Sequence, residues 1–254
     1  MRDRGRLICR RRSPGRKLLL AVVLLAAVTV GILHIRKAAE TAADMEVYTE
    51  VAEVYNRSAG EYRDLLNITS VENITGLPDV PDPYEIRENL PQKEILPETE
   101  RILREWEELR YAVLLARQIT EPTVQWVTER LRMLEGITEC MAVTEERDPN
   151  GMLGKDGGYT ACVYFIFDGV PQETIPGEDA VTKGTDGGGA VEVYRTAADA
   201  LARCEYLAQF DNTLLYTGSC AVVGTMVIRT SYVLTDEEQW LLTDRITRSF
   251  TEVW

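Results

Sequence analysis

The longest apolar segment of the chain lies near its N-terminus. Residues 18–35 carry no acidic or strongly basic side chain and are bounded by Lys17 and Arg36. As a helix, this segment would be about 27 Å long, close to the ~30 Å hydrocarbon core of a bilayer. Four flanking cations, Arg16, Lys17, Arg36 and Lys37, could extend their charged groups to the two interfaces. The pattern predicts a transmembrane helix at 18–35.

A cleaved secretion signal is the alternative interpretation of this segment. The apolar core of a signal is shorter, about 7–15 residues, and a small-residue cleavage site follows it. The Ala-rich stretch that could be cut, residues 38–43, lies beyond the charges of Arg36 and Lys37. Cys9 precedes the core, so it cannot be the lipidated cysteine of an exported lipoprotein. We therefore favour a retained anchor.

Basic residues cluster on one side of the apolar segment. Residues 1–17 contain eight Lys or Arg and one acidic residue, Asp3. Segments rich in Lys and Arg stay in the cytoplasm, where they suit the anionic lipids of the inner leaflet. We expect a basic cytoplasmic tail at 1–17, with residues 38–254 outside the cell.

A helical pattern continues through residues 38–66, which contain no proline. This predicts a helical stalk whose stripe could pair with a partner or a second copy, or pack on its own domain. Tyrosines are poor core residues of coiled coils, so we favour packing within the chain. The stripe residues recur at steps of three and four: Tyr48, Val51, Tyr55, Ser58, Tyr62 and Leu65.

Prolines interrupt the helical pattern after the stalk. Residues 67–97 hold five of the ten prolines, which predicts an extended, mostly exposed linker. Helical periodicity returns at 98–119 and again from Val124 until Gly136. Residues 98–136 are therefore predicted to form a helical hairpin, with a single kinked helix as the alternative.

The period of the pattern changes to two at Ile137. Residues 137–254 are predicted to form a small α+β domain in the order β-β-β-α-β-α, with two layers and the helices on one face of the sheet. A loop is expected at 171–189. The expected strands are 137–144, 159–170, 190–196 and 220–233, and the expected helices are 196–210 and 234–250.

The expected exterior is strongly acidic and has no histidine. The whole chain has a formal net charge of −13, yet residues 1–40 hold ten Lys or Arg and two Asp or Glu, a net of +8. The remainder therefore carries −21, which repels nucleic acid. The one histidine, His34, ends the apolar segment. The exterior therefore cannot build Ser-His-Asp or Cys-His nucleophiles or a His-ligated zinc site.

Four cysteines lie in the expected exterior: Cys140, Cys162, Cys204 and Cys220. An even number in an oxidising compartment permits two disulfides, and four small buried apolar residues are the alternative. Cys204 and Cys220 are the favoured pair, because a predicted helix ends near one and a strand begins at the other. A bridge between Cys140 and Cys162 is permitted if the first two strands fold back about Gly151.

Other residue patterns match binding motifs only in part. The glycines of 184–189 lack the Gly-Lys-Ser/Thr of a phosphate loop, and Asp148 begins a calcium-like loop that lacks its further ligands. Arg229 lies opposite the apolar residues of its predicted strand, which indicates a solvated sheet face. We predict no catalytic, cofactor-binding or metal-ligating residue and no cofactor.

A set of helix-cap and core positions from Val191 onward forms a recognisable pattern: Asp199-Ala200, Arg203, Tyr206, Val223-Gly224, Arg229, Ser231, Leu234, Thr235, Glu237 and Glu238. With these residues, the segment resembles the C-terminal part of small uncharacterised exported or lipid-anchored proteins of Gram-positive Firmicutes. The resemblance covers about 60 residues and departs from the lipid-anchored members in the apolar segment. It implies a Gram-positive exported protein and no catalytic residue.

Together these patterns predict a single-pass membrane protein with an extracytoplasmic domain. Its expected role is non-enzymatic: binding, assembly or sensing at the cell envelope. The expected partners are the lipid bilayer, through residues 18–35, and an unidentified envelope component or protein. A carboxylate-dependent envelope hydrolase and a small-ligand-binding sensor domain are the alternatives.

Overall fold

The structure, a computed structural model, describes residues 14–69, 77–211, 213 and 216–253, with side chains from Thr29 onward. These residues form six α-helices and one five-stranded sheet, so the protein is α+β, as predicted. The chain divides into two compact units. Unit 1 contains Met1–Glu53 and Glu85–Ile102, and unit 2 contains Val54–Tyr84 and Leu103–Trp254.

One continuous helix, α1 (Pro14–Thr69), contains both the predicted span 18–35 and the predicted stalk 38–66. No proline follows Pro14 until Pro78, so nothing in the sequence interrupts the backbone hydrogen bonds between them. Most side chains of 18–35 lie outside the described residues, as do residues 1–13 of the predicted tail. Within the described part of the chain, no helix combines the length and the apolar character that crossing a membrane requires.

In unit 1, the tyrosine stripe begins with a residue that contacts the segment leading into the second helix, α2 (Gln92–Gln118). Tyr48 is fully buried, and its hydroxyl accepts a hydrogen bond from the backbone N–H of Arg87 at 3.1 Å. The helix α2 begins five residues before the predicted linker would end at Pro97. Burial of Ile95 and Ile102 outweighs the one backbone hydrogen bond that Pro97 cannot donate.

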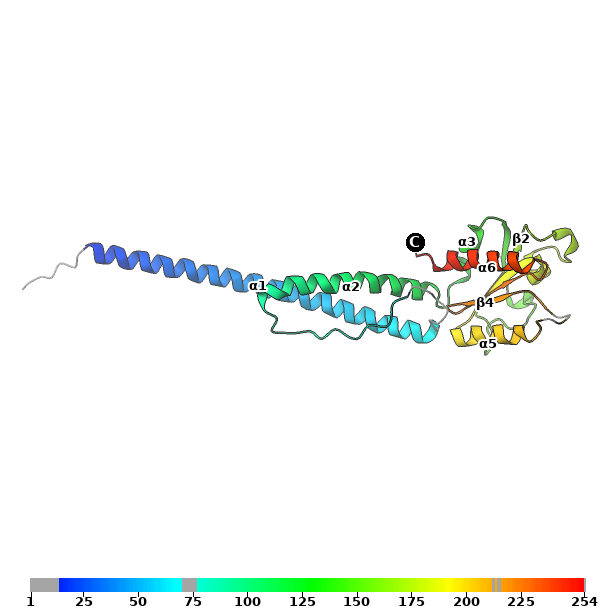
Figure 1. The fold of residues 1–254 in the computed structure, drawn as a ribbon, viewed down its shortest axis with the longest axis horizontal. Helices are drawn as coiled ribbons and strands as arrows, with labels where there is room; N and C mark the ends of the chain where they lie inside the picture. The colour runs from blue at the N-terminus through cyan, green and yellow to red at the C-terminus, as the bar shows by residue number, and fades with distance from the viewer. Residues whose placement is uncertain (1–13, 70–76, 212, 214–215, 254) are drawn as a thin grey trace, which may run out of the picture. The chain divides into compact units, whose positions relative to one another are not determined.

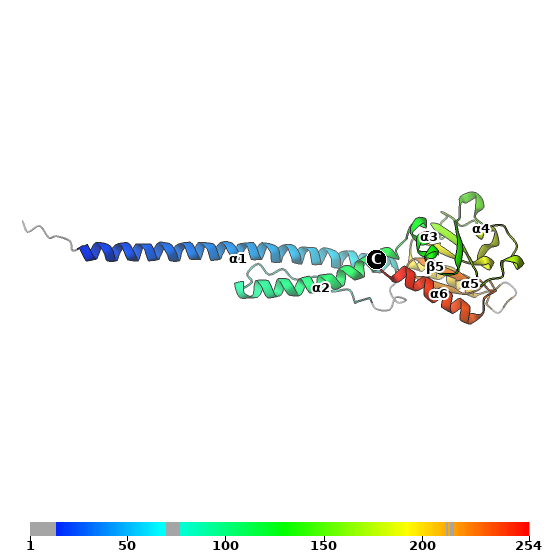
Figure 2. The same ribbon diagram turned by 90° about the horizontal axis from the view of Figure 1, so that it is seen from above.

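In unit 2, the stripe continues with Tyr55 and Tyr62, both buried. Ser58, which also belongs to the stripe, accepts a hydrogen bond from Trp106 Nε1 of α2 at 3.1 Å. Figure 1 and Figure 2 both show α2 alongside α1. Because Tyr55 and Tyr62 are already buried in this structure, the stripe packs within the chain.

The proline-rich segment of unit 2 is extended, but it is attached to α1. Tyr62 donates its hydroxyl to the carbonyl of Pro78 at 2.9 Å. The amide of Asn56 binds both the N–H and the carbonyl of Tyr84, at 2.6 and 2.9 Å. These bonds make the segment a strap along the helix and not a free linker.

The sheet has the order β1-β2-β3-β5-β4, and every neighbouring pair is antiparallel. The predicted strand 220–233 is wrong in one respect, because it is a hairpin of two strands. Gly224 and Thr225 form its turn, and Gly224 has a φ of 58°, the positive value that a type II′ turn requires at this position. The strands are β1 (Ile137–Ala142), β2 (Ala161–Phe167), β3 (Gly188–Val193), β4 (Cys220–Val223) and β5 (Met226–Thr230).

Helices cover both faces of the sheet, so the prediction of two layers is wrong. The helices α3 (Val124–Arg132) and α6 (Asp236–Thr251) pack on one face, and α4 (Ala180–Lys183) and α5 (Ala197–Ala208) pack on the other. The burial of the central strand agrees with coverage on both sides, since every residue of β3 is buried. In a strand with one face in water, buried and exposed residues would alternate. Because α3 packs on the sheet and α6, residues 98–136 do not form a hairpin of their own.

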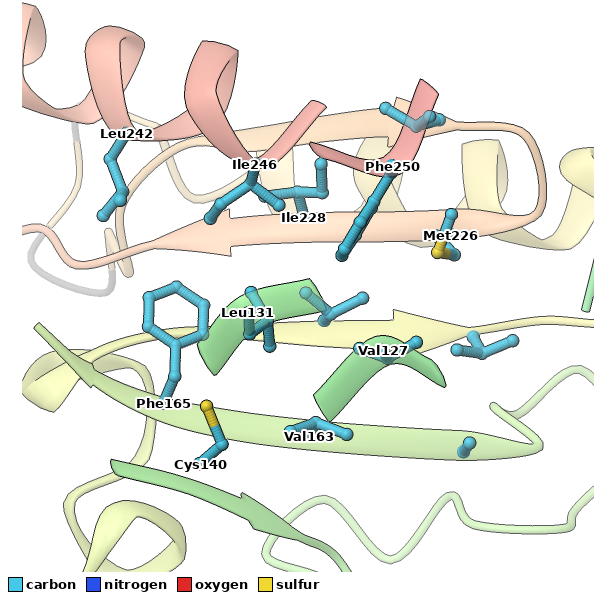
Figure 3. Packing of buried hydrophobic residues seen from close by; sticks show 14 of the residues in the cluster. Val127, Leu131, Cys140, Val163, Phe165, Met226, Ile228, Leu242, Ile246 and Phe250 are labelled. Atoms are coloured by element: carbon cyan, nitrogen blue, oxygen red, sulfur yellow. The ribbon is translucent and has the colours of Figure 1, made fainter. Parts of the chain in front are cut away.

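The first face carries a core of apolar side chains, and the buried Arg130 of α3 binds the backbone carbonyl of Ser249 on α6 beside it. Figure 3 shows Val127 and Leu131 of α3 and Phe250 of α6 meeting Phe165 and Ile228 of the sheet. The second face is different, because tyrosines and charged residues accompany its apolar side chains. The candidate site therefore lies on the second face.

The predicted loop 171–189 contains short helical turns. Asp179 and Thr182 form a capping box for α4, which brings Ala180 and Val181 into the core of the second face. Two 3₁₀ turns, Gln172–Thr174 and Gly184–Gly187, complete the segment. The segment is thus part of the layer over the sheet.

Candidate functional site

Two central strands each place one charged side chain on the second face. Glu192 of β3 is fully buried, and Arg229 of β5 is only 5% exposed. Arg229 Nη1 donates to Glu192 Oε1 at 3.0 Å. The expectation that Arg229 lies on a solvated sheet face is wrong, because α5 covers this face.

A third charged residue, Arg203, reaches the same carboxylate from α5. Its Nε donates to Glu192 Oε2 at 3.0 Å and its Nη2 donates to Oε1 at 3.2 Å. Tyr194 adds a hydroxyl donor to Oε2 at 2.8 Å. Glu192 therefore accepts four hydrogen bonds, which is about the capacity of a carboxylate.

The protonation states of this cluster follow from burial and charge. Burial alone would raise the pKa of Glu192, but the guanidinium groups of Arg229 and Arg203 lower it below its ordinary value. Burial raises the pKa of the Cys162 thiol and of the Tyr194 phenol, and the Glu192 charge adds to both shifts. At neutral pH the cluster thus contains two cations, one carboxylate and neutral thiol and phenol groups.

The two arginines keep donors that no described residue uses. Arg229 Nη2 donates to Thr217 Oγ1 at 3.0 Å, which leaves Arg229 Nε and Arg203 Nη1 without an acceptor among the described residues. Among these residues, only Thr243 Oγ1 is a fully buried side-chain polar atom without a partner. Both arginines line the open cavity described next, where these donors can meet water or a ligand.

An open cavity of about 660 Å³ lies over the two arginines. Its apolar wall includes Tyr206 and Phe210 of the α5 region, whose rings meet edge to face at 5.3 Å between centroids. The Arg203 guanidinium lies 5.7 Å from the Tyr206 ring centroid, within cation–π range. The lining residues are Asn150, Met152, Gly157, Asp199, Ala202, Arg203, Tyr206, Leu207, Phe210, Thr217 and Arg229.

The turn that forms the opposite wall is organised by Asp148. Its carboxylate accepts hydrogen bonds from the backbone N–H groups of Asn150, Met152 and Leu153, at 3.0, 2.6 and 2.7 Å, and from the Tyr159 hydroxyl. Burial tends to raise the pKa of Asp148, but these bonds hold it below its ordinary value. Asp148, which begins the calcium-like sequence, thus uses its carboxylate oxygens to bind groups of its own turn and of Tyr159. Within the described part of the chain, no three His, Cys, Asp or Glu residues are placed to hold a metal ion.

A disulfide joins Cys204 and Cys220, the pair that the sequence favours, with 5.7 Å between their Cα atoms. Cys204 follows Arg203 on α5, and Cys220 pairs with Arg229 across β4 and β5. The bridge therefore connects α5, which carries Arg203, to β4, the strand that pairs with the Arg229 strand β5.

The other two cysteines are free and buried, so the permitted bridge between them does not form. Cys140 pairs with Phe165, and its side chain belongs to the core of the first face. Cys162 pairs with Glu192 and belongs to the core of the second face. The two thiols therefore point to opposite sides of the sheet.

A second cavity, of about 710 Å³, lies beside the disulfide. Its charged lining residues are Glu205, Asp211 and Asp236, all acidic and all exposed. It has no buried polar group comparable to the arginine cluster, so we regard the Arg203–Arg229 cavity as the candidate site.

The predicted membrane-flanking residues belong to unit 1, whereas the cavity belongs to unit 2. Arg36 and Lys37 are exposed on α1, and the side chains of Arg16 and Lys17 lie outside the described ones. The sequence did not identify Glu192 and Arg203 as site residues. A usable signal was present, since strands 188–193 and 226–230 are otherwise uncharged and each contains one charge, of opposite sign.

No protein-family model matches the chain, and no curated protein or solved structure is significantly similar to it.

Proposed function

We propose that the protein is a single-pass, membrane-anchored binding protein of a Gram-positive cell envelope. Its C-terminal domain lies outside the cell and binds a small ligand, in a sensing or assembly role without catalysis. The apolar segment 18–35 and the basic residues before it support the anchor and its orientation. The resemblance of residues from Val191 onward to exported Firmicute proteins supports the compartment.

The observation that carries the proposal is the cavity over Arg203 and Arg229. Ligand sites are concave, mostly apolar and fitted with a few convergent polar groups. This cavity has that combination, with aromatic side chains on one wall and arginine donors that remain accessible. Its size falls within the usual range of small-molecule sites, roughly 300–1,000 Å³.

The carboxylates near the cavity favour binding over hydrolysis. A carboxylate hydrolase needs one group that donates a proton and a second that acts as base or nucleophile. Glu192 is bonded to two arginines, and Asp199 accepts the Thr196 hydroxyl at 2.7 Å. Both carboxylates are thus engaged in fixing the structure.

The test is ligand binding by the full chain in lipid nanodiscs, scored as a rise in unfolding temperature. A defined panel of amino acids, short peptides, sugars and organic acids serves as probes. Ala202→Trp fills the cavity, whereas Ala198→Trp adds the same ring to an exposed position of α5 that does not line it. At 100 times Kd a ligand should stabilise the wild type and Ala198→Trp by about 2.7 kcal/mol, and Ala202→Trp much less.

The proposed binding role is wrong if no probe stabilises the wild type. It is also wrong if Ala202→Trp responds as strongly as Ala198→Trp, because the ligand then binds elsewhere.

A further inference from the structure

We infer that the ligand of the Arg203–Arg229 cavity carries one carboxylate on an apolar or aromatic body. This inference rests on the proposed binding function and specifies the chemistry of its ligand.

The unused donors favour an acceptor that is an anionic oxygen. Arg203 Nη1 and Arg229 Nε belong to two guanidinium groups that Glu192 already holds within hydrogen-bond distance of one carboxylate. Both side chains are less than a tenth exposed, at 9% and 6%, so their positions are fixed by packing. Planar carboxylates match guanidinium donors in geometry and in charge.

Local charge limits the ligand to a single negative charge. The two arginines are opposed by three carboxylates, which are Glu192, Asp199 at the rim and Asp148 in the adjoining turn, so the empty cavity has no excess positive charge that would hold a dianion. One carboxylate gains charge-assisted hydrogen bonds that outweigh a modest repulsion from Asp199. A dicarboxylate or a phosphate dianion carries twice the negative charge, so the repulsion from the carboxylates is about doubled. A cationic ligand is instead repelled by the two arginines.

The walls require an apolar body. Met152, Leu207 and Phe210 line the cavity, and Tyr206 is half exposed there although its ring is large. Covering this surface removes apolar area from water, which favours binding. A free acetate or formate ion would use the arginines but leave these walls uncovered.

The test compares three probes that share one body: 4-phenylbutanoate, its neutral amide 4-phenylbutanamide, and the cation 4-phenylbutylammonium. Binding to the full chain in nanodiscs is measured by saturation-transfer NMR, with empty nanodiscs subtracted to remove partition into lipid. We expect the carboxylate to bind about tenfold more tightly than the amide, and the cation to bind most weakly. Phenylsuccinate, a dianion, should bind more weakly than 4-phenylbutanoate.

The variant Arg203→Met tests the assignment, because it removes one guanidinium and leaves the Arg229–Glu192 pair in place. It should abolish most of the preference for acid over amide, because affinity for the acid should fall much more than affinity for the amide. The matched control is Arg248→Met, which removes an exposed arginine paired with Asp244 on α6 and should change neither affinity. Folding of each variant is checked by its unfolding temperature.

Equal affinities for acid and amide, or an unchanged preference in Arg203→Met, would overturn the inference. The arginine cluster would then be structural only, and the proposed function would stand if panel ligands still responded to Ala202→Trp. Failure of every panel ligand is the separate result that removes the proposed function.

Discussion

Glu192 is one of the few charged residues that the structure buries completely, and its environment explains why it is tolerated. A buried carboxylate is costly unless it is paired and hydrogen-bonded. Four donors from Arg203, Arg229 and Tyr194 satisfy it. Three of these four bonds hold the two arginines beside the cavity, so one residue serves both stability and the arrangement of the site.

Glu192→Gln is expected to lower the free energy of unfolding by about 3–5 kcal/mol, because it leaves two buried cations with a weakened partner. The control is Asp244→Asn, which breaks an exposed pair with Arg248 and should cost less than about 1 kcal/mol. Urea unfolding followed by tryptophan fluorescence measures both. A loss in Glu192→Gln no larger than in Asp244→Asn would contradict the assignment.

The same variant should alter the pH dependence of stability. Because the pKa of Glu192 is lowered in the folded state, its ionised form stabilises the fold above the ordinary value of 4.5. That contribution is lost as the pH falls through the folded pKa. Wild type should therefore lose more stability than Glu192→Gln between pH 5 and the acid limit of folding.

Residue patterns alone did not predict this cluster, for a physical reason. A single charge on a strand is equally consistent with a solvated face and with a buried ion pair. The deciding fact for Arg229 is the coverage of the sheet by α5, which depends on how distant segments pack. The favoured cysteine pair was easier to predict, because Cys204 and Cys220 are separated by only 16 residues.

At the scale of elements, α5 is the part on which the site depends most. It supplies Arg203 and the aromatic wall, and the disulfide attaches its end to β4. Thr196 caps the start of the helix by accepting the N–H of Asp199 at 3.1 Å. Both ends of α5 are thus held in place.

Replacing both bridging cysteines, Cys204→Ser with Cys220→Ser, should lower the free energy of unfolding by about 3 kcal/mol, the loop-entropy value for a closed loop of this length. It should also weaken binding of 4-phenylbutanoate, because Arg203 is less firmly positioned. The control is reductant, which should destabilise the wild type and leave the double variant unchanged. Equal sensitivity of both proteins to reductant would show that the bridge does not stabilise this domain.

The elements were predictable where the determining signals are local. The capping box of Thr235 and Glu238 correctly marks the start of α6. The β4–β5 hairpin was missed although Gly224 lies in the middle of an apolar run, because a glycine there is also compatible with a bulge. The start of α2 was missed because Pro97 normally marks a helix end, and tertiary burial decided otherwise.

At the scale of the whole molecule, composition and periodicity were sufficient for the α+β class but not for its layers. The change of period at Ile137 correctly separates the helical segments from the sheet-containing part. The number of layers depends on whether the second face of the sheet is covered. Tyr164 and Cys162 face that side, and their types fit either a covered or an exposed face.

The placement of the chain across a membrane is the prediction that decides the biological setting of the cavity. If residues 18–35 anchor the protein and the basic tail stays inside, an external protease should remove a C-terminal epitope from intact cells. An N-terminal epitope should persist in the membrane fraction, because a retained anchor keeps residues 1–17. Loss of the N-terminal epitope from the membrane fraction of untreated cells would instead indicate a cleaved signal.

The control for this experiment is a cytoplasmic protein, which must survive, together with a known surface protein, which must be digested. A variant in which Arg10, Arg11 and Arg12 become glutamate should retain less of the C-terminal domain outside, because orientation follows the Lys and Arg content of the flank. Should the C-terminal epitope be as protected as the cytoplasmic control, the cavity faces the reducing cytosol. The disulfide of Cys204 and Cys220 would then not persist there, and the ligand would have to be sought among intracellular carboxylates.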